Sequence, residues 1–364
     1  MKVQKEVVTR YVGIDLGKRT YQAAFVQKGA VKKSNGKTYV EGRQGLYAKL
    51  RPTDKVGLEA CSLAFIMAKE MEAAVGCQVY VLNPHRLAVI YASMKKTDKE
   101  DSLKLAHMLE DFQEERLPLV PVPREKEMER RKVLAGYRRG QQSRVREINR
   151  LHGLFLAQGI TTMKRRDLKT EQERKEAIKV LSGLEREEAE YLVTCLSLHE
   201  NRIVALEKQM EEETAGDEEI QRLQSVPGVG PMVSFAFASH VAAERFENPG
   251  QLSNYLGLVP RVYMSGDTVR YGSITKRGNS YVRALLVQAA WSMVRSKDGG
   301  KLKEIYKDMT KDRSTSKKKA IVAVARRIGE LLYTLMRDGT KYESKPYKRD
   351  KKEVEKLAQE ALSA

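Results

Sequence analysis

The chain of 364 residues is poor in the residue types that build disulfide frameworks and zinc sites. Its three cysteines, Cys61, Cys77 and Cys195, are too few and too scattered for a disulfide framework, and they fit reduced thiols packed as small hydrophobic groups. Five histidines and the lack of a Cys-x-x-Cys pair argue against a structural zinc site. The composition therefore indicates a protein of a reducing compartment.

Long apolar runs are also missing. No run approaches the roughly 20 residues that a membrane-spanning helix needs. The first ten residues, MKVQKEVVTR, lack the apolar stretch of a secretory signal. We therefore expect no membrane span and a cytoplasmic protein.

Negative charge is in short supply. Lysine and arginine number 67 against 48 aspartates and glutamates, which leaves a net charge of +19. A surplus of this size predicts a polyanionic partner, with nucleic acid as the first candidate and an anionic membrane surface as the second. With 41% hydrophobic residues, the chain can still bury a substantial core, in two or three domains.

The first third of the chain alternates between strand and helix signals. Short apolar and β-branched runs predict strands at residues 11–14, 21–26, 38–40, 56–59 and 78–82. Helical spacing predicts helices at residues 62–74, 86–93 and 98–112. This order suits a mixed α/β fold in which helices pack on a mixed sheet.

Four carboxylates stand at notable places in this region. Asp15 and Glu59 each end an apolar strand, and an acid on a core strand is costly to bury unless it is paired or holds a metal. Asp98 and Asp101 are three residues apart, so a helix places them on one face. Simpler readings exist, with Asp15 capping a turn and the helical pair serving as a cap and a first-turn acid.

Docking of the 98–112 helix on the sheet is able to bring the four acids together. Converging carboxylates repel one another and raise each other's pKa values, and a divalent cation relieves that repulsion. Hard oxygen ligands favour Mg²⁺ or Mn²⁺. Two such ions can support phosphodiester cleavage.

The middle of the chain is charged and helical in pattern. Three prolines in residues 117–123 indicate a linker, and residues 124–213 contain no proline. Apolar residues at three-, four- and seven-residue steps predict two long antiparallel helices, as a hairpin or coiled coil. A plain scaffold bundle is the alternative. Five arginines on the first helix are candidates for contact with a nucleic-acid backbone or for a solvated face: Arg138, Arg139, Arg144, Arg146 and Arg150.

Glycine punctuates the last third. Residues 223–230 resemble a helix-hairpin-helix element, whose amides hold a DNA phosphate, although a simple helical corner is the alternative. Residues 255–280 are predicted to form a long glycine-rich loop able to wrap a phosphodiester. Its basic residues, continuing into the next helix, are Arg261, Arg270, Lys276, Arg277 and Arg283. Ser265 lies among them, either as a nucleophile or as an ordinary turn serine.

These motifs together resemble a known family. It comprises insertion-sequence transposases with a RuvC-like acidic domain and a C-terminal serine domain, which are relatives of the pilin gene invertase and include bridge-RNA-guided recombinases. The resemblance rests on the following motifs: Gly13-Ile14-Asp15, Leu58-Glu59-Ala60, Asn83-Pro84, Lys96-Thr97-Asp98 with Asp101, Val226-Pro227-Gly228-Val229-Gly230, Gly257-Leu258-Val259-Pro260-Arg261, Ser265-Gly266, and Lys276-Arg277-Gly278-Asn279 before Arg283.

The resemblance implies a fold in four parts. These are a RuvC-like acidic domain at residues 1–122, a helical coiled-coil hairpin at 123–215, a mostly helical serine transposase domain at 216–340 and a basic tail at 341–364. It implies Asp15, Glu59, Asp98 and Asp101 as Mg²⁺ or Mn²⁺ ligands and Ser265 as the nucleophile. The acidic domain would supply the metal that the serine lacks locally, in some arrangements from another subunit.

The partners implied are donor and target double-stranded DNA, a structured guide RNA and further copies of the chain, as a dimer or tetramer, in a prokaryotic cytoplasm at the nucleoid. Arg138, Arg139 and Arg146 are the residues we assign to RNA. The leading hypothesis is a recombinase that acts through a covalent phosphoserine. The alternatives are a RuvC-like metal-dependent nuclease or junction resolvase, with Ser265 structural, and a non-enzymatic architectural nucleic-acid protein.

Overall fold

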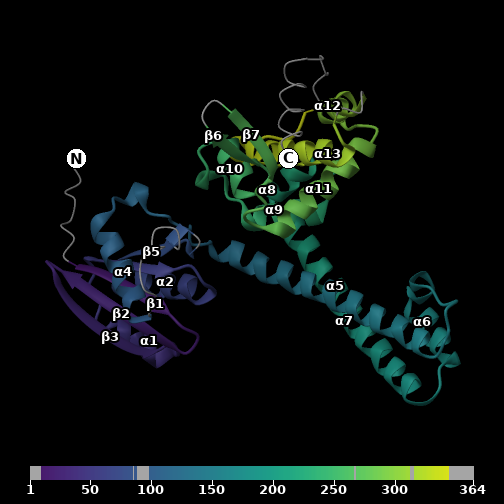
Figure 1. Cartoon of the computed structure of the whole chain (residues 1–364), viewed down its shortest axis with the longest axis horizontal. Helices are drawn as coiled ribbons and strands as arrows, with labels where there is room; N and C mark the ends of the chain where they lie inside the picture. The colour runs from purple at the N-terminus through teal and green to yellow at the C-terminus, as the bar shows by residue number, and fades with distance from the viewer. Residues whose placement is uncertain (1–9, 85, 88–97, 266–267, 312–314, 344–364) are drawn as a thin grey trace. The chain divides into compact units, whose positions relative to one another are not determined.

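The computed structural model describes residues 10–84, 86–87, 98–265, 268–311 and 315–343 (Figure 1). Most of the helix expected at residues 86–93 and of the basic tail lies outside these ranges. The chain divides into two compact units, Met1–Arg124 and Glu125–Ala364. The four-part division expected from the sequence stays a prediction.

A five-stranded mixed sheet forms the centre of the first unit. The strands lie in the order β3-β2-β1-β4-β5. Their bounds are β1 Arg10–Leu16, β2 Thr20–Gln27, β3 Ala30–Lys37, β4 Asp54–Glu59 and β5 Gln78–Leu82. The first three strands form an antiparallel meander, whereas β4 and β5 run parallel to β1. This arrangement confirms the mixed α/β fold expected from the sequence and agrees with a RuvC-like domain.

Among the described residues, the helices that accompany this sheet include α1 Val40–Tyr47, α2 Ser62–Val75 and α4 Asp98–Asp111. Alternate residues of β1 and β4, including Val12, Ile14 and Leu58, are fully buried in one cluster with α2. Apolar residues of α4, among them Leu105 and Leu109, form a separate cluster with β5. The sheet therefore has a buried layer on each face, one made by α2 and one by α4.

The third strand differs from the prediction. We expected it at residues 38–40, but β3 is Ala30–Lys37 and Val40 begins α1. The reason is that β3 is an outer strand with nearly all of its side chains exposed or half-exposed, so it carries no apolar signal. Tyr39 and Val40, which gave the false signal, are themselves exposed.

Two long helices of 33 residues each, α5 Glu125–Ala157 and α7 Gly183–Ala215, open the second unit. Late in α5, Arg150 pairs with Glu188, which is early in α7, and early in α5, Arg130 pairs with Glu213, which is late in α7. The helices are therefore antiparallel, as the hairpin prediction requires, while a coiled coil stays a prediction. Gly159, with a φ of +75°, lies just beyond the end of α5. Short α6, Glu171–Ala177, lies in the segment that joins the two helices.

In the described residues, the remainder of the second unit is a helical core with one pair of strands. The helices are α8 Glu218–Gln224, α9 Pro231–His240, α10 Pro249–Tyr255, α11 Ser280–Arg295, α12 Gly300–Lys311 and α13 Lys317–Asp338. Buried residues of α9, α11 and α13 form the largest hydrophobic cluster of the described chain. In the described ranges, no helix is both long and apolar enough to cross a bilayer.

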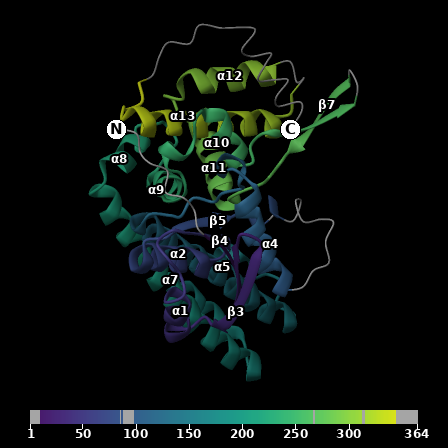
Figure 2. The same cartoon turned by 90° about the vertical axis from the view of Figure 1, so that its left-hand side faces the viewer.

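The long loop predicted at residues 255–280 is only partly a loop. Its centre is an antiparallel pair of strands, β6 Pro260–Ser265 and β7 Thr268–Ile274. We call this pair the β6–β7 ribbon; Figure 2 shows it extending from the helices of its unit. The prediction failed because arginine, glycine and serine interrupt the apolar pattern of these exposed strands and weaken the signal that a core strand gives.

Candidate active site

Asp15 and Glu59 lie at the same edge of the sheet. β1 and β4 are parallel neighbours, and Ile14 is opposite Leu58. Asp15 and Glu59 are the next residues of the two strands, and both are half-buried. Since neighbouring strands are about 4.8 Å apart, two acids at one level of adjacent strands are close neighbours. The fold thus brings together these two acids of the four.

Both acids belong to the face of the sheet that α4 covers. Side chains alternate along a strand, so Asp15 shares a face with Gly13, and Glu59 shares that face with Gly57. A Cβ atom at Gly13 would collide with the backbone of Ser102, and one at Gly57 would lie 3.0 Å from a methyl carbon of Leu109. These two glycines therefore allow α4 to lie against the strands that carry the acids.

The third and fourth predicted acids belong to the first turn of α4. Ser102 packs on Gly13, two residues before Asp15, which places the beginning of the helix over β1. Asp101 is half-buried, and one of its carboxylate oxygens accepts a hydrogen bond of 3.0 Å from Lys104 Nζ. The Asp98 side chain lies outside the described residues.

Asp15 and Glu59 fit a divalent cation as two of its ligands. Two carboxylates on adjacent strands repel each other, and hard oxygen donors of this kind suit Mg²⁺ or Mn²⁺. Among the side chains that the structure describes, no three of the types His, Cys, Asp and Glu are arranged to hold a metal ion. Further ligation by Asp98 and Asp101 therefore stays a prediction.

Ser265 is the last residue of β6, and its side chain is exposed. It lies opposite Thr268, and Tyr263 lies opposite Arg270. Because paired residues share a face, Ser265, Tyr263 and Arg270 lie on one face of the ribbon. Arg270 is then the diagonal neighbour of Ser265, at roughly 7–8 Å between backbone positions, which a guanidinium group can span to a shared phosphate.

Arg261 lies farther from the serine. It precedes Ser265 by four residues on the same strand, which corresponds to roughly 13 Å. A Cβ atom at Gly272 would approach both Tyr263 and Arg261, so Arg261 also belongs to this face. The sequence treated Arg261 and Arg270 alike, but the strand register favours Arg270 as the group beside the serine.

The base of the ribbon is held by tight turns. Gly278 has a φ of +74°, and a Cβ atom there would collide with the Tyr255 carbonyl. Arg283 donates hydrogen bonds of 2.9 Å and 3.0 Å to the carbonyls of Leu256 and Arg277, and burial lowers its pKa. Arg283, predicted to contact nucleic acid, is therefore engaged in fixing these turns. Lys276 and Arg277 are exposed.

The arginines of α5 fall into two groups. Arg144 and Arg150 form ion pairs with glutamates of α7 and so join the two helices. Arg138, Arg139 and Arg146 are exposed. Arg138 lies 5.1 Å from the centre of the Tyr281 ring, whereas within the described ranges Arg139 and Arg146 have no carboxylate within ion-pair distance.

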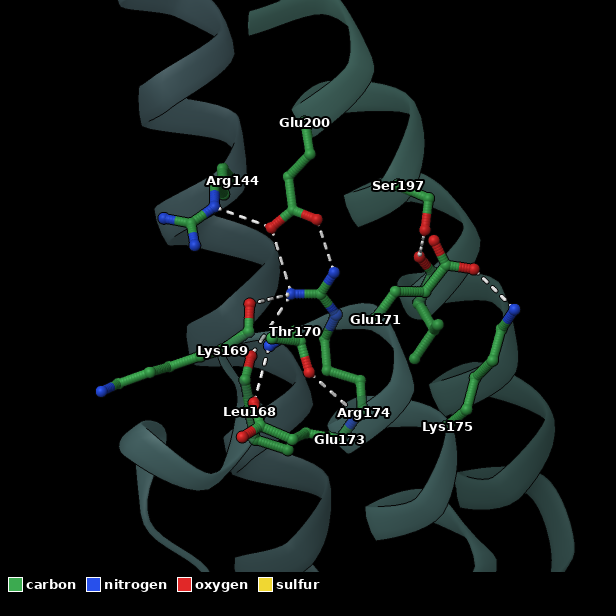
Figure 3. Close-up of polar contacts among 11 residues, drawn as sticks. Arg144, Leu168, Lys169, Thr170, Glu171, Glu173, Arg174, Lys175, Ser197 and Glu200 are labelled. Carbon is green, nitrogen blue, oxygen red and sulfur yellow. Dashed lines mark hydrogen bonds and ion pairs between the residues drawn. The ribbon is translucent and has the colours of Figure 1, made fainter. Parts of the chain in front are cut away.

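The sequence did not predict that one arginine of this hairpin is buried. The Arg174 side chain is fully buried, and its Nη2 lies 2.5 Å from an oxygen of Glu200 (Figure 3). Nη1 donates to the carbonyls of Leu168 and Lys169, and Arg144 donates to Glu200 from the other side. The Thr170–Glu173 capping box was a sequence signal for α6, but no pattern marks its arginine as buried.

Two family models match the chain over the regions just described. Residues 12–160 match the DEDD model of the IS110 group, described as a transposase. Residues 220–307 match the model described as the transposase IS116/IS110/IS902 family. The first match includes all four acids and the second includes Ser265.

Two curated proteins that resemble the chain over most of its length are named as transposases. A "Probable family 20 transposase" of Pseudomonas aeruginosa is 29% identical over 302 residues, covering 78% of this chain and 84% of that protein. The "Transposase for insertion sequence element IS1328" of Yersinia enterocolitica is 26% identical over 302 residues, covering 77% of this chain and 82% of that protein. The similarity thus extends over most of both chains.

Proposed function

We propose that the chain is an insertion-sequence transposase of the IS110/IS116 kind, whose family models match residues 12–160 and 220–307, and that it cuts and rejoins DNA through a covalent bond between Ser265 and a DNA phosphate. One observation carries this proposal. Ser265 is exposed at the end of a ribbon strand, and Arg270 is its diagonal neighbour on the same face. This arrangement supports the proposal, because it sets a serine hydroxyl beside a cation able to bind the phosphate that the serine would attack.

The proposed step conserves atoms and charge. The Ser265 oxygen forms a bond to phosphorus while the bond from phosphorus to one deoxyribose oxygen breaks. The serine proton passes to water, and the departing oxygen takes up a proton. Arg270 stabilises the charge that develops on the phosphate. Attack by a second DNA hydroxyl reverses the step and rejoins a new strand, so the reaction consumes no co-reactant.

The acidic centre of the first unit is the second part of the proposal. Asp15 and Glu59, joined by Asp98 and Asp101 of α4, would hold Mg²⁺ or Mn²⁺. A cation bound there supplies positive charge that polarises phosphate oxygens and stabilises a leaving oxygen. The chain's own contribution is to hold two acids at one sheet edge, where α4 is seated by the absence of side chains at Gly13 and Gly57.

We further propose that a structured guide RNA lies along α5 and that the active form contains several copies of the chain. Arg139 and Arg146 support the first point, because they are exposed and, among the residues that the structure describes, have no ion pair like those that occupy Arg144 and Arg150. RNA of defined shape is read largely through its backbone, for which such arginines are suited.

The direct test is to incubate the protein with its RNA, Mg²⁺ and a duplex target, to denature the mixture, and to look for DNA attached to protein. We expect an adduct with the wild type and none with Ser265→Ala, which keeps its nucleic-acid binding. Ser273→Ala is the matched control, because Ser273 is an exposed serine of the same ribbon. Recombination without an adduct, or an adduct that persists in Ser265→Ala, would favour a metal-only nuclease instead.

A further inference from the structure

The β6–β7 ribbon has two chemically different faces. One carries Arg261, Tyr263, Ser265 and Arg270, as the register shows. The other face carries Val262, Met264 and Tyr271. Val262 pairs with Tyr271 across the ribbon, and Met264 is two residues farther along β6, so the three side chains point the same way. Both arginines and the serine thus lie on one side together with Tyr263, which we call the arginine face, and Val262, Met264 and Tyr271 lie on the other, which we call the apolar face.

The apolar face is open to solvent. Val262 is 51% exposed, Met264 is 72% exposed and Tyr271 is 55% exposed. Beyond Pro260, every residue of β6 is exposed, so the described residues of this unit do not bury the strand. An isolated two-stranded ribbon is only marginally stable in water, and three adjacent exposed apolar groups add a further cost. These features indicate a surface whose partner is absent from the free protein.

Charge complementarity identifies the partner. Arg261 and Arg270 on the ribbon, with Lys276 and Arg277 at its base, are exposed cations in a chain with a net charge of +19. A DNA groove offers phosphates on its wall and base surfaces inside, and a two-stranded ribbon is one of the elements that a groove admits. Apolar side chains placed among bases are known to unstack them and to kink the duplex.

We propose that the β6–β7 ribbon enters a DNA groove, with its arginine face on the sugar-phosphate backbone and its apolar face on the bases, and that Met264 unstacks a base step beside the phosphate that Ser265 attacks. The last clause rests on the proposed function. Met264 and Ser265 are consecutive residues near the end of β6 and point in opposite directions, so the residue beside the serine faces inward when the serine faces a phosphate.

Unstacking at this place would serve the reaction. A phosphate at a kinked step is less constrained by its neighbours, and a freed strand is able to change partners. Base unstacking is unfavourable, and the backbone contacts of the arginine face offset its cost. The energy of binding would thereby be used to open the duplex at the reacting bond.

The test uses the full chain carrying Ser265→Ala, so that strand cutting does not interfere. The protein is bound to relaxed closed-circular plasmid, a type I topoisomerase is added, and the linking number is measured after the protein is removed. We expect a linking-number change that grows with bound protein. Adding Met264→Ser should reduce this change several-fold at equal occupancy, and Tyr271→Thr should reduce it in the same direction. Leu198→Ser, which alters an exposed apolar residue of α7, is the control and should leave it unchanged.

Three outcomes would overturn the proposal. The first is an equal linking-number change with and without Met264. The second is no change with either protein. The third is that Met264→Ser alters the mass of the DNA-free protein in sedimentation but not the linking number, which would make the apolar face a contact between copies. The Ser265 adduct is scored separately, so unstacking without an adduct refutes only the proposed function, and an adduct without unstacking refutes only this inference.

Discussion

Gly13 and Gly57 lie opposite each other on adjacent parallel strands, and both face α4. In each strand the acid follows two residues later, as Asp15 and Glu59. The two glycines thus set how closely α4 approaches the sheet, and the two carboxylates lie on that same face of the sheet.

Replacing Gly13 by alanine should damage both fold and cleavage. The added methyl group would meet the backbone of Ser102, which cannot rotate away as a side chain can, so α4 must shift. We expect a loss of about 3 kcal/mol in unfolding free energy, the upper part of the range for overpacking, measured by denaturant titration. Gly45→Ala is the matched control, because its Cβ would meet no atom within 4 Å and alanine favours helix α1. Equal stabilities of the two variants would refute the close approach.

Neutralising the acids should remove activity and leave the fold intact. Asp15→Asn or Glu59→Gln removes one charge of a repelling pair, so we expect an unchanged or slightly higher melting temperature and no DNA cleavage in Mg²⁺. Mn²⁺ should raise the melting temperature of the wild type and have little effect on either variant. Full Mg²⁺-dependent activity in Asp15→Asn would disprove the acidic centre.

Asp54 offers the contrast, because its role is structural. Its side chain is fully buried and accepts two hydrogen bonds from Arg10, of 3.0 Å and 2.6 Å. Asp54→Ala leaves that guanidinium group without its partner and should cost about 3 kcal/mol or more. A fall in melting temperature for Asp54→Ala, with none for Asp15→Asn, would separate the two kinds of acid.

The two groups of arginines on α5 predict opposite results. Arg139→Gln and Arg146→Gln should weaken RNA binding, and each should lower the slope of log affinity against log salt by roughly 0.7 to 0.9. Arg144→Gln should instead destabilise the hairpin, since it removes a 2.9 Å contact to Glu200, and should leave the salt slope nearly unchanged. Filter binding over a salt series, with a thermal melt of each variant, checks both. Unchanged slopes for Arg139 and Arg146 would make α5 a scaffold only.

His240 should make the second unit sensitive to mild acid. Burial lowers its pKa to about 4, against a hydrogen bond with the Ala236 carbonyl and with help from the charge of Arg131. Between its ordinary value of 6.5 and about 4, the unfolded chain takes up a proton that the folded chain does not, so stability falls as pH falls. From about pH 7 to about pH 5 the wild type should lose about 2 kcal/mol more than His240→Gln. Parallel stability curves would exclude this role.

Most strands and helices of the first unit could be predicted from the sequence, because its core strands have a clear apolar pattern. Residues 56–59 and 78–82 are apolar where β4 and β5 are buried, and the four acids were selected by their places at strand and helix ends. The register that sets Asp15 beside Glu59 depends on contacts between distant residues, which one sequence does not encode locally. For the same reason the sequence treated Gly13 as part of a motif without revealing that α4 packs on it.

The exposed strands could not be predicted from the sequence, and the reason is different. Neither β3 nor the β6–β7 ribbon buries a face in the described unit, so hydrophobic alternation, the main signal of a strand, is weak in one and mixed with arginine in the other. Arg174 is the converse case, a charged residue that is fully buried because Glu200 and two carbonyls receive its hydrogen bonds. Its burial depends on Glu200 of α7, which is 26 residues distant in the sequence.

The antiparallel helices α5 and α7 pair in a fixed register along their length. Gly136 meets Leu206 and Gly140 meets Ile203, so one step forward on α5 corresponds to about one step back on α7. Each helix, at 33 residues, measures about 50 Å. A deletion in one helix alone would slide every later pair out of match, including Arg144 with Glu200. Removal of seven residues from both helices would shorten the hairpin by about 10 Å and keep the pairing. The length of this hairpin can therefore change without loss of its pairing only when both helices are shortened or lengthened by the same number of residues.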